Sequence, residues 1–166
     1  MRILIFSDNH GERYNIDRII KQWIPLDRII SLGDSEMSEN ELSNLEIIGV
    51  KGNYPFEPKF PTELNFNFEG VNCFFTHGHH YHVKSGVSSL LQKAYLNKYD
   101  IVGFGHTHRV FLEEISGIIM INPGALSSCR SYNNPTYAVL EITKSLITVT
   151  IYNVYDNVIK KLEKKR

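Results

Sequence analysis

Four of the seven histidines in this chain lie within one short stretch. The stretch THGHHYH, at residues 76–82, contains His77, His79, His80 and His82. Imidazole is a common ligand for divalent metal ions, so the cluster suggests a metal site. An HxH pair taken alone, however, is more often part of a solvated loop than a pair of ligands. The choice between these two interpretations depends on groups elsewhere in the chain.

Polar residues also follow four other short apolar runs, each of which is typical of a buried strand. Taken singly, an aspartate in such a place is usually a turn residue or a helix cap. Together the groups offer carboxylate, amide and imidazole side chains, enough for two divalent ions that share a bridging carboxylate. In open α/β sheets the strand ends gather at one edge, where sites form. The four groups are Asp8-Asn9-His10, Gly33-Asp34, Gly52-Asn53 and the stretch GFGHTH at 103–108.

The elements that must position these groups follow from the apolar pattern. We predict an α/β fold in which two packed mixed sheets are flanked by helices, within a single domain spanning residues 1–166. The predicted strands are 2–7, 27–34, 46–53, a hairpin at 63–70 and 71–78, 99–106, and four short runs after residue 108. The predicted helices are 14–23, stopped by Pro25, a brief one within 38–45, and 87–99.

The charge balance limits the range of partners. Lys+Arg and Asp+Glu number 18 each, which argues against a long nucleic acid as the ligand. The basic run KKLEKKR at 160–166 is interpreted as a solvated terminus. We expect a small-molecule substrate, and a homo-oligomer stays open.

Cysteine usage and the start of the chain bear on the compartment. Cys73 lies in an apolar run, and neither it nor Cys129 belongs to a CxxC pair, so we expect a reducing compartment and no disulfide. The chain begins directly with a strand-like run and has no apolar run near 18 residues. We therefore expect a cytoplasmic protein that does not associate with a membrane.

The order of the polar groups resembles the calcineurin-like metallophosphoesterase superfamily. The motifs DxH, GD, GN, H and GHxH occur in that order. The segments MRILIFSDNHG, THGHH and GHTH followed by INPG are similar to the small prokaryotic phosphodiesterase branch of the superfamily. The resemblance covers about residues 1–142. It implies a double β-sandwich with helices outside (α/β/β/α), which agrees with the pattern of elements.

The resemblance also implies a site for two divalent metal ions. Manganese is expected, because an oxygen and nitrogen ligand set without thiolate favours it or another borderline ion, and nickel, iron or zinc are alternatives. Two ions roughly 3.5–4 Å apart would clamp a phosphoryl group, and the hydroxide that bridges them would attack phosphorus. The implied reaction is hydrolysis of a small phosphodiester. By motif, the first ion is held by Asp8, His10 and His108, Asp34 bridges, and the second ion is held by Asn53, His77 and His106.

Two positions depart from the family's pattern. Tyr54 and Pro55 follow Asn53, where the family has a histidine or cysteine and an acidic residue. His79, two residues from His77, is a candidate general acid in place of the missing imidazole, and the alternative is that it only orients the loop. The second departure lies downstream, where the branch has NPGS and a Pro-Arg pair and this chain has Asn122-Pro123-Gly124-Ala125 and Cys129-Arg130. Arg130 either contacts the substrate phosphate or holds its own loop.

Two other functions stay open. A eukaryotic retromer subunit resembles this fold, lacks key metal-ligand histidines and serves as a scaffold, so a non-catalytic interaction protein is one alternative. A nuclease for short oligonucleotides is the other. Because all seven ligand positions are filled here, the leading hypothesis is an enzyme, a binuclear metal-dependent phosphodiesterase.

Overall fold

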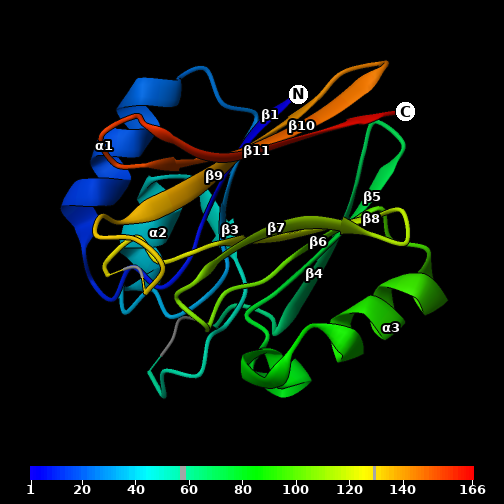
Figure 1. The fold of residues 1–166 in the computed structure, drawn as a ribbon. Coiled ribbons are helices and arrows are strands. Elements are labelled where there is room, and N and C mark those ends of the chain that lie inside the picture. The colour runs from blue at the N-terminus through cyan, green and yellow to red at the C-terminus, as the bar shows by residue number, and fades with distance from the viewer. Residues whose placement is uncertain (57–58, 129) are drawn as a thin grey trace.

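The first of two mixed sheets carries the N-terminus and three parallel strands. The computed structural model describes residues 1–56, 59–128 and 130–166. Within these, the first sheet has the order β11-β10-β9-β1-β2-β3, with β1 parallel to β2 and β2 parallel to β3 (Figure 1). Its strands are β1 (Arg2–Phe6), β2 (Arg28–Ser31), β3 (Ile47–Gly49), β9 (Thr136–Ile142), β10 (Leu146–Asn153) and β11 (Val158–Lys165).

The second sheet has the order β4-β5-β6-β8-β7. The predicted hairpin is confirmed as the antiparallel pair β4–β5, and β6 lies parallel to both β5 and β8. The strands are β4 (Glu63–Phe68), β5 (Val71–Thr76), β6 (Ile101–Gly103), β7 (Val110–Ile115) and β8 (Ile118–Pro123). Two turns of 3₁₀ helix follow β5, η1 at His79–Tyr81 and η2 at Val83–Ser85.

The two sheets pack face to face, and helices cover their outer faces (Figure 1). The main core lies between the sheets, where residues of β1 such as Ile3 and Ile5 belong to one buried cluster with Phe75 of β5. On the outside of the first sheet, α1 (Arg13–Trp23) and α2 (Glu39–Asn44) bury Ile16, Ile19 and Leu42. On the outside of the second sheet, α3 (Ser88–Asn97) buries Leu90 and Ala94. The predicted α/β double sandwich is therefore confirmed.

The interpretation of the basic tail as a solvated terminus is confirmed only in part, because its lysines are mostly exposed but the segment forms a strand. The run KKLEKKR lies within and just beyond β11, an edge strand paired antiparallel with β10. Ile159 and Leu162 pack against the main core, while the lysines lie mostly at the surface. The strand register shifts between Ile151 and Tyr152, so the inward residues are three apart and the simple two-residue alternation of a strand is hidden. Lysines on an edge strand discourage pairing with a second chain.

The structure also bears on the two cysteines and on the question of a membrane-spanning helix. Cys73 is buried, as expected of a small apolar residue, whereas Cys129 lies outside the described residues. Among the helices that the structure describes, none combines the length and apolar character needed to cross a bilayer.

We predict that β11 contributes to stability through its inward side chains. Leu162→Ala removes apolar surface packed on the core and should lower the free energy of unfolding by about 1–2 kcal/mol. Lys160→Ala, on an exposed position of the same strand, is the matched control and should change it by less than about 0.5 kcal/mol. Urea titration followed by circular dichroism measures both values. Equal effects of the two substitutions would mean that β11 does not pack as described.

Candidate metal centre

The carboxyl ends of strands from both sheets meet around one set of polar side chains. Asp8 follows β1, Asp34 follows β2 and Asn53 follows β3 in the first sheet. His77 follows β5, and the loop with His106 and His108 follows β6, in the second sheet. Two groups of potential ligand atoms result, and within each group the atoms lie within 4.8 Å of one another. They are Asp8, His10 and His108, and Asp34, His77 and His106.

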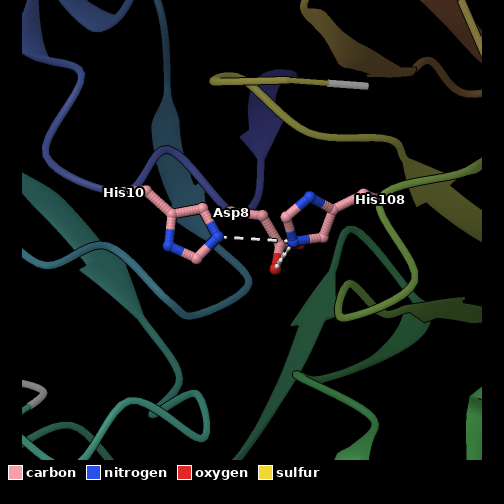
Figure 2. A group of neighbouring side chains, drawn as sticks. All are labelled: Asp8, His10 and His108. Carbon is pink, nitrogen blue, oxygen red and sulfur yellow. Dashed lines mark hydrogen bonds and ion pairs between the residues drawn. The ribbon is translucent and has the colours of Figure 1, made fainter. Parts of the chain in front are cut away.

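The first group joins the two sheets through one carboxylate and two imidazoles (Figure 2). His108 Nε2 lies 3.2 Å from Asp8 Oδ1 and 3.3 Å from His10 Nε2. Asp8 is fully buried, and its Oδ1 has no hydrogen-bond partner among the described residues. A buried carboxylate oxygen without a donor, facing two imidazole nitrogens, is the arrangement expected where a cation binds.

The second group lies directly beside the first. His77 Nε2 is 3.4 Å from Asp34 Oδ2, 3.2 Å from His106 Nδ1 and 3.2 Å from Asn53 Oδ1. It is also 4.0 Å from Asp8 Oδ1 of the first group. The structure therefore brings together all seven residues that the motifs predict as ligands.

In three of the histidines, the contact made by one ring nitrogen shows that the other ring nitrogen is free to bind a cation. His10 Nδ1 lies 2.6 Å from Glu36 Oε1, His77 Nδ1 lies 2.7 Å from the carbonyl oxygen of Leu32, and His108 Nδ1 lies 3.3 Å from that of Ser128. Each acceptor favours the tautomer with the proton on Nδ1, which leaves the lone pair on Nε2. In all three rings Nε2 faces its group, so the side chains fit a divalent metal ion.

The backbone of the site is held in an uncommon conformation. Asp8, His10, Asp34, His106 and His108 all have positive φ, from 44° to 68°. Asp and His tolerate this left-handed region better than most residues, but it still costs energy and is typical of functional sites. Hydrogen bonds between neighbouring loops stabilise it, including Asp8 N to the carbonyl oxygen of Gly33 and His10 N to that of Asp34.

The electrostatics of the second group centre on His77 and Asp34. Burial opposes the protonated form of His77, but the hydrogen bond to Asp34 and the charges of Asp8 and Asp34 outweigh it and raise the pKa of His77. Burial likewise opposes the charged form of Asp34, but the interaction with His77 holds the pKa of Asp34 well below its usual range. The raised pKa of His77 favours a proton on this group when no cation is bound, and because a cation must displace that proton, affinity for the metal should fall as the pH is lowered.

Two other imidazoles respond to different neighbours. The carboxylate of Asp8 raises the pKa of His108. Burial, together with the charges of His77 and Lys84, lowers the pKa of His106 to about 4, so this ring is neutral near pH 7 and able to act as a ligand.

His79 lies beside the site but in neither ligand group. Its ring centroid is 5.4 Å from that of His77, and its buried Nδ1 has no hydrogen-bond partner among the described residues. Burial, with the charges of His80 and His77, lowers the pKa of His79 to about 4. His80 and His82 are exposed and also lie outside both groups.

The two departures from the family pattern have structural consequences. The amide N–H of Tyr54 donates to Asp34 Oδ1 at 2.9 Å, so this position supports the site through its backbone. The Arg130 amide N–H donates to the carbonyl oxygen of His108 at 2.6 Å, and its side chain is exposed. Arg130 therefore holds the loop, and a contact with substrate stays a prediction.

Several residues that support the site had no signal in the sequence. The Ser7 hydroxyl donates to Asp8 Oδ2 at 2.5 Å, and the His106 amide donates to the same oxygen at 3.1 Å. Asn122 Nδ2 donates to the carbonyl oxygen of Gly105 and to Thr107 Oγ1. Asn122 belongs to the INPG motif, which could have indicated its role. The contact between Glu36 and His10 depends on a loop geometry that no spacing rule gives.

The comparisons with known proteins agree with this geometry. Residues 1–145 match the model of the calcineurin-like phosphoesterase superfamily domain. The chain is 31% identical to probable metallophosphoesterase YsnB of Bacillus subtilis, with 99% of this chain and 98% of the relative covered. It is 29% identical to phosphodiesterase MJ0936 of Methanocaldococcus jannaschii, with 87% and 95% covered.

A protein named for vacuolar protein sorting has the same fold. The structure of vacuolar protein sorting 29 from Cryptosporidium parvum superposes with a TM-score of 0.83 at 19% identity, covering 99% of this chain and 98% of the other. At that identity the likeness concerns the fold alone. The match of the family model over most of the sequence, and the relatives that align along nearly its whole length, show that this chain belongs to the calcineurin-like phosphoesterase superfamily.

Proposed function

We propose that this chain is a metal-dependent phosphodiesterase that hydrolyses a small phosphodiester at a site for two divalent ions. The observation that carries the proposal is the pair of adjacent ligand groups. Asp8 Oδ1 lies 3.2 Å from His108 Nε2 in one group and 4.0 Å from His77 Nε2 in the other. Two ions held this close together, when bound, polarise the phosphoryl oxygens and lower the pKa of a water molecule.

In this proposal the seven motif residues divide between the two ions. Asp8, His10 and His108 hold the first, Asp34 bridges, and Asn53, His77 and His106 hold the second. The set contains nitrogen and oxygen ligands without thiolate, which favours manganese, with nickel, iron or zinc as alternatives. Glu36 and the Leu32 carbonyl keep His10 and His77 in the tautomer that binds a cation.

Cavities beside the ligand groups favour a diester as the substrate. One is lined by Asn53, Tyr54 and His79, and another by Thr107, Phe111 and Arg130. A diester has two ester groups, and one could enter each cavity while the phosphoryl group lies between them. The relative from Methanocaldococcus jannaschii is named a phosphodiesterase, which supports the same substrate class.

The scaffold function is the second candidate, because a vacuolar sorting protein has this fold. In this chain, however, every predicted ligand position carries a side chain able to bind a metal ion, and Asp8 Oδ1 is buried without a donor among the described residues. An interaction surface alone does not require that arrangement. A nuclease for short oligonucleotides would differ from the proposed enzyme only in its substrate, and hydrolysis of a dinucleotide would reveal it.

Metal content tests the two-ion site. Asp34→Asn replaces the proposed bridging carboxylate by an amide, and should lower the bound manganese from about two ions per chain to about one or fewer and abolish turnover. Elemental analysis after dialysis measures the content. His80→Ala, an exposed imidazole outside both groups, is the matched control and should keep both ions. Full metal content and full activity in Asp34→Asn would contradict the bridging role.

Substrate preference tests the reaction class. For an aryl diester and an aryl monoester with the same leaving group, kcat/KM should favour the diester by at least about tenfold, or about 1.4 kcal/mol in transition-state stabilisation. The monoester has no second ester group for a flanking cavity, and it brings a second negative charge close to Asp8 and Asp34. A preference for the monoester would refute the proposed class.

The role of His79 can be tested with leaving groups of different basicity. A pKa of about 4 leaves the ring neutral at pH 7, which favours the orienting role over the general acid. We therefore expect His79→Ala to slow good and poor leaving groups by similar factors and to retain both ions. A general acid would give a selective loss, about 10²–10⁴-fold for alkoxide leaving groups only. His82→Ala, exposed and outside both groups, is the control.

A further inference from the structure

The cavity next to the His106–His108 loop has a distinct chemical character. Its volume is about 750 Å³, and it lies between η2, the loop after β6 and the start of β7. Thr107 lines it, and the two neighbours of Thr107 in the chain are the predicted ligands His106 and His108. A molecule bound at the metal groups would therefore lie next to this cavity.

Three cations and no carboxylate line this cavity. The cations are Lys84, Arg109 and Arg130, and no acidic residue is among the lining residues that the structure describes. All three side chains belong to exposed residues. None of them forms an ion pair with any residue in the described parts of the chain, whereas Arg2, Arg13 and Lys93 each pair with a carboxylate there. Three unpaired cations around one opening produce a local positive potential in a protein with no net charge.

The floor of the cavity is apolar. Phe104 and Val83 are buried, and Phe111 is half-buried. The Phe104 and Phe111 rings pack together with their centroids 6.0 Å apart. An apolar floor with cations at its rim fits a short aliphatic or aromatic group that ends in an anion, because the body packs on the rings while the charge meets Lys and Arg.

The cavity lined by Asn53, Tyr54 and His79 differs in these respects. Its lining includes one lysine, Lys51, together with Tyr54, His79 and His80. Two ester groups of one diester would thus meet unequal surroundings. This difference in charge between the two cavities would let the site distinguish the two ester arms of a substrate.

We propose that the cavity lined by Lys84, Arg109 and Arg130 binds a second anionic group, a carboxylate or a phosphate, carried by one ester arm of the diester substrate. The proposal rests on the proposed phosphodiesterase function and narrows its substrate class to diesters with a charged arm. A long polyanion is not favoured, because the positive charge is confined to this cavity and the net charge of the chain is zero.

A matched pair of substrates tests the proposal in the manganese-loaded protein. p-Nitrophenyl 2-carboxyethyl phosphate and p-nitrophenyl propyl phosphate share a leaving group and differ in the anion on the retained arm. We expect kcat/KM to favour the carboxyethyl ester by about fivefold, since each partly exposed ion pair contributes modestly. The preference should shrink when the salt concentration is raised from about 0.1 M to about 1 M, where screening is much stronger.

Substitutions locate the effect in the cavity. The double variant Lys84→Gln/Arg109→Gln should bring the ratio of kcat/KM values for the two substrates close to one. Lys144→Gln is the matched control, because it removes an exposed lysine in the turn between β9 and β10, which lies at the opposite end of β1 from Asp8. The control should leave the ratio at its wild-type value.

A binding measurement separates this proposal from the proposed function. Calorimetry compares 3-phosphonopropionate with butylphosphonate, neither of which is hydrolysed, on the wild type and the double variant. Tighter binding of the carboxylate that is lost in the double variant supports the subsite, even if no diester is turned over and the proposed function fails. Diester turnover with no preference for the charged arm in either measurement would overturn the subsite while the proposed function stands.

Discussion

The whole site depends on how closely the rims of the two sheets approach each other. Carboxylates from the first sheet must reach imidazoles from the second, and neither group of ligands is complete within one sheet. Glycines make the approach sterically feasible. A Cβ at Gly105 would collide with Ser7 Oγ, and a Cβ at Gly52 would collide with Asp34 Oδ1. Gly105 is therefore required by packing between the two sheets, and Gly52 by packing between two loops of the first sheet, as much as by local turns.

The same constraint explains the strained backbone. After a parallel strand ends, the chain must turn at once so that the next side chain points across to the other sheet, and positive φ achieves this turn. Glycine would adopt the conformation without strain but would supply no ligand. Asp and His supply a group able to bind a metal and adopt positive φ with less strain than most other residues. Main-chain hydrogen bonds between loops, such as that from Gly105 N to the carbonyl oxygen of His77, offset part of the strain that is left.

The sequence pattern predicted the helices and strands whose conformation depends on residues nearby in the chain. The strand, helix and strand from Arg2 to Ser31, and the hairpin of β4 and β5, follow from apolar periodicity and turn residues. The strand β11 was missed because lysines dominate its sequence and a register shift hides its alternation. Within the site, the motifs predicted the seven residues that the structure brings together there. The contacts of Ser7 and Glu36 were not, because they join loops that only the fold brings together.

The departure at Tyr54 separates what the fold requires from what the substrate requires. The structure uses the amide of Tyr54 to hold Asp34 Oδ1, and any residue except proline supplies that amide. The side chain is thereby free to change, and here it lines one of the cavities beside the ligand groups. Arg130 of the other cavity is in the same situation, because it supports the His108 loop through its backbone. Backbone contacts thus preserve the two groups of polar side chains, while the side chains at Tyr54 and Arg130 are free to vary with the molecule that the cavities accept.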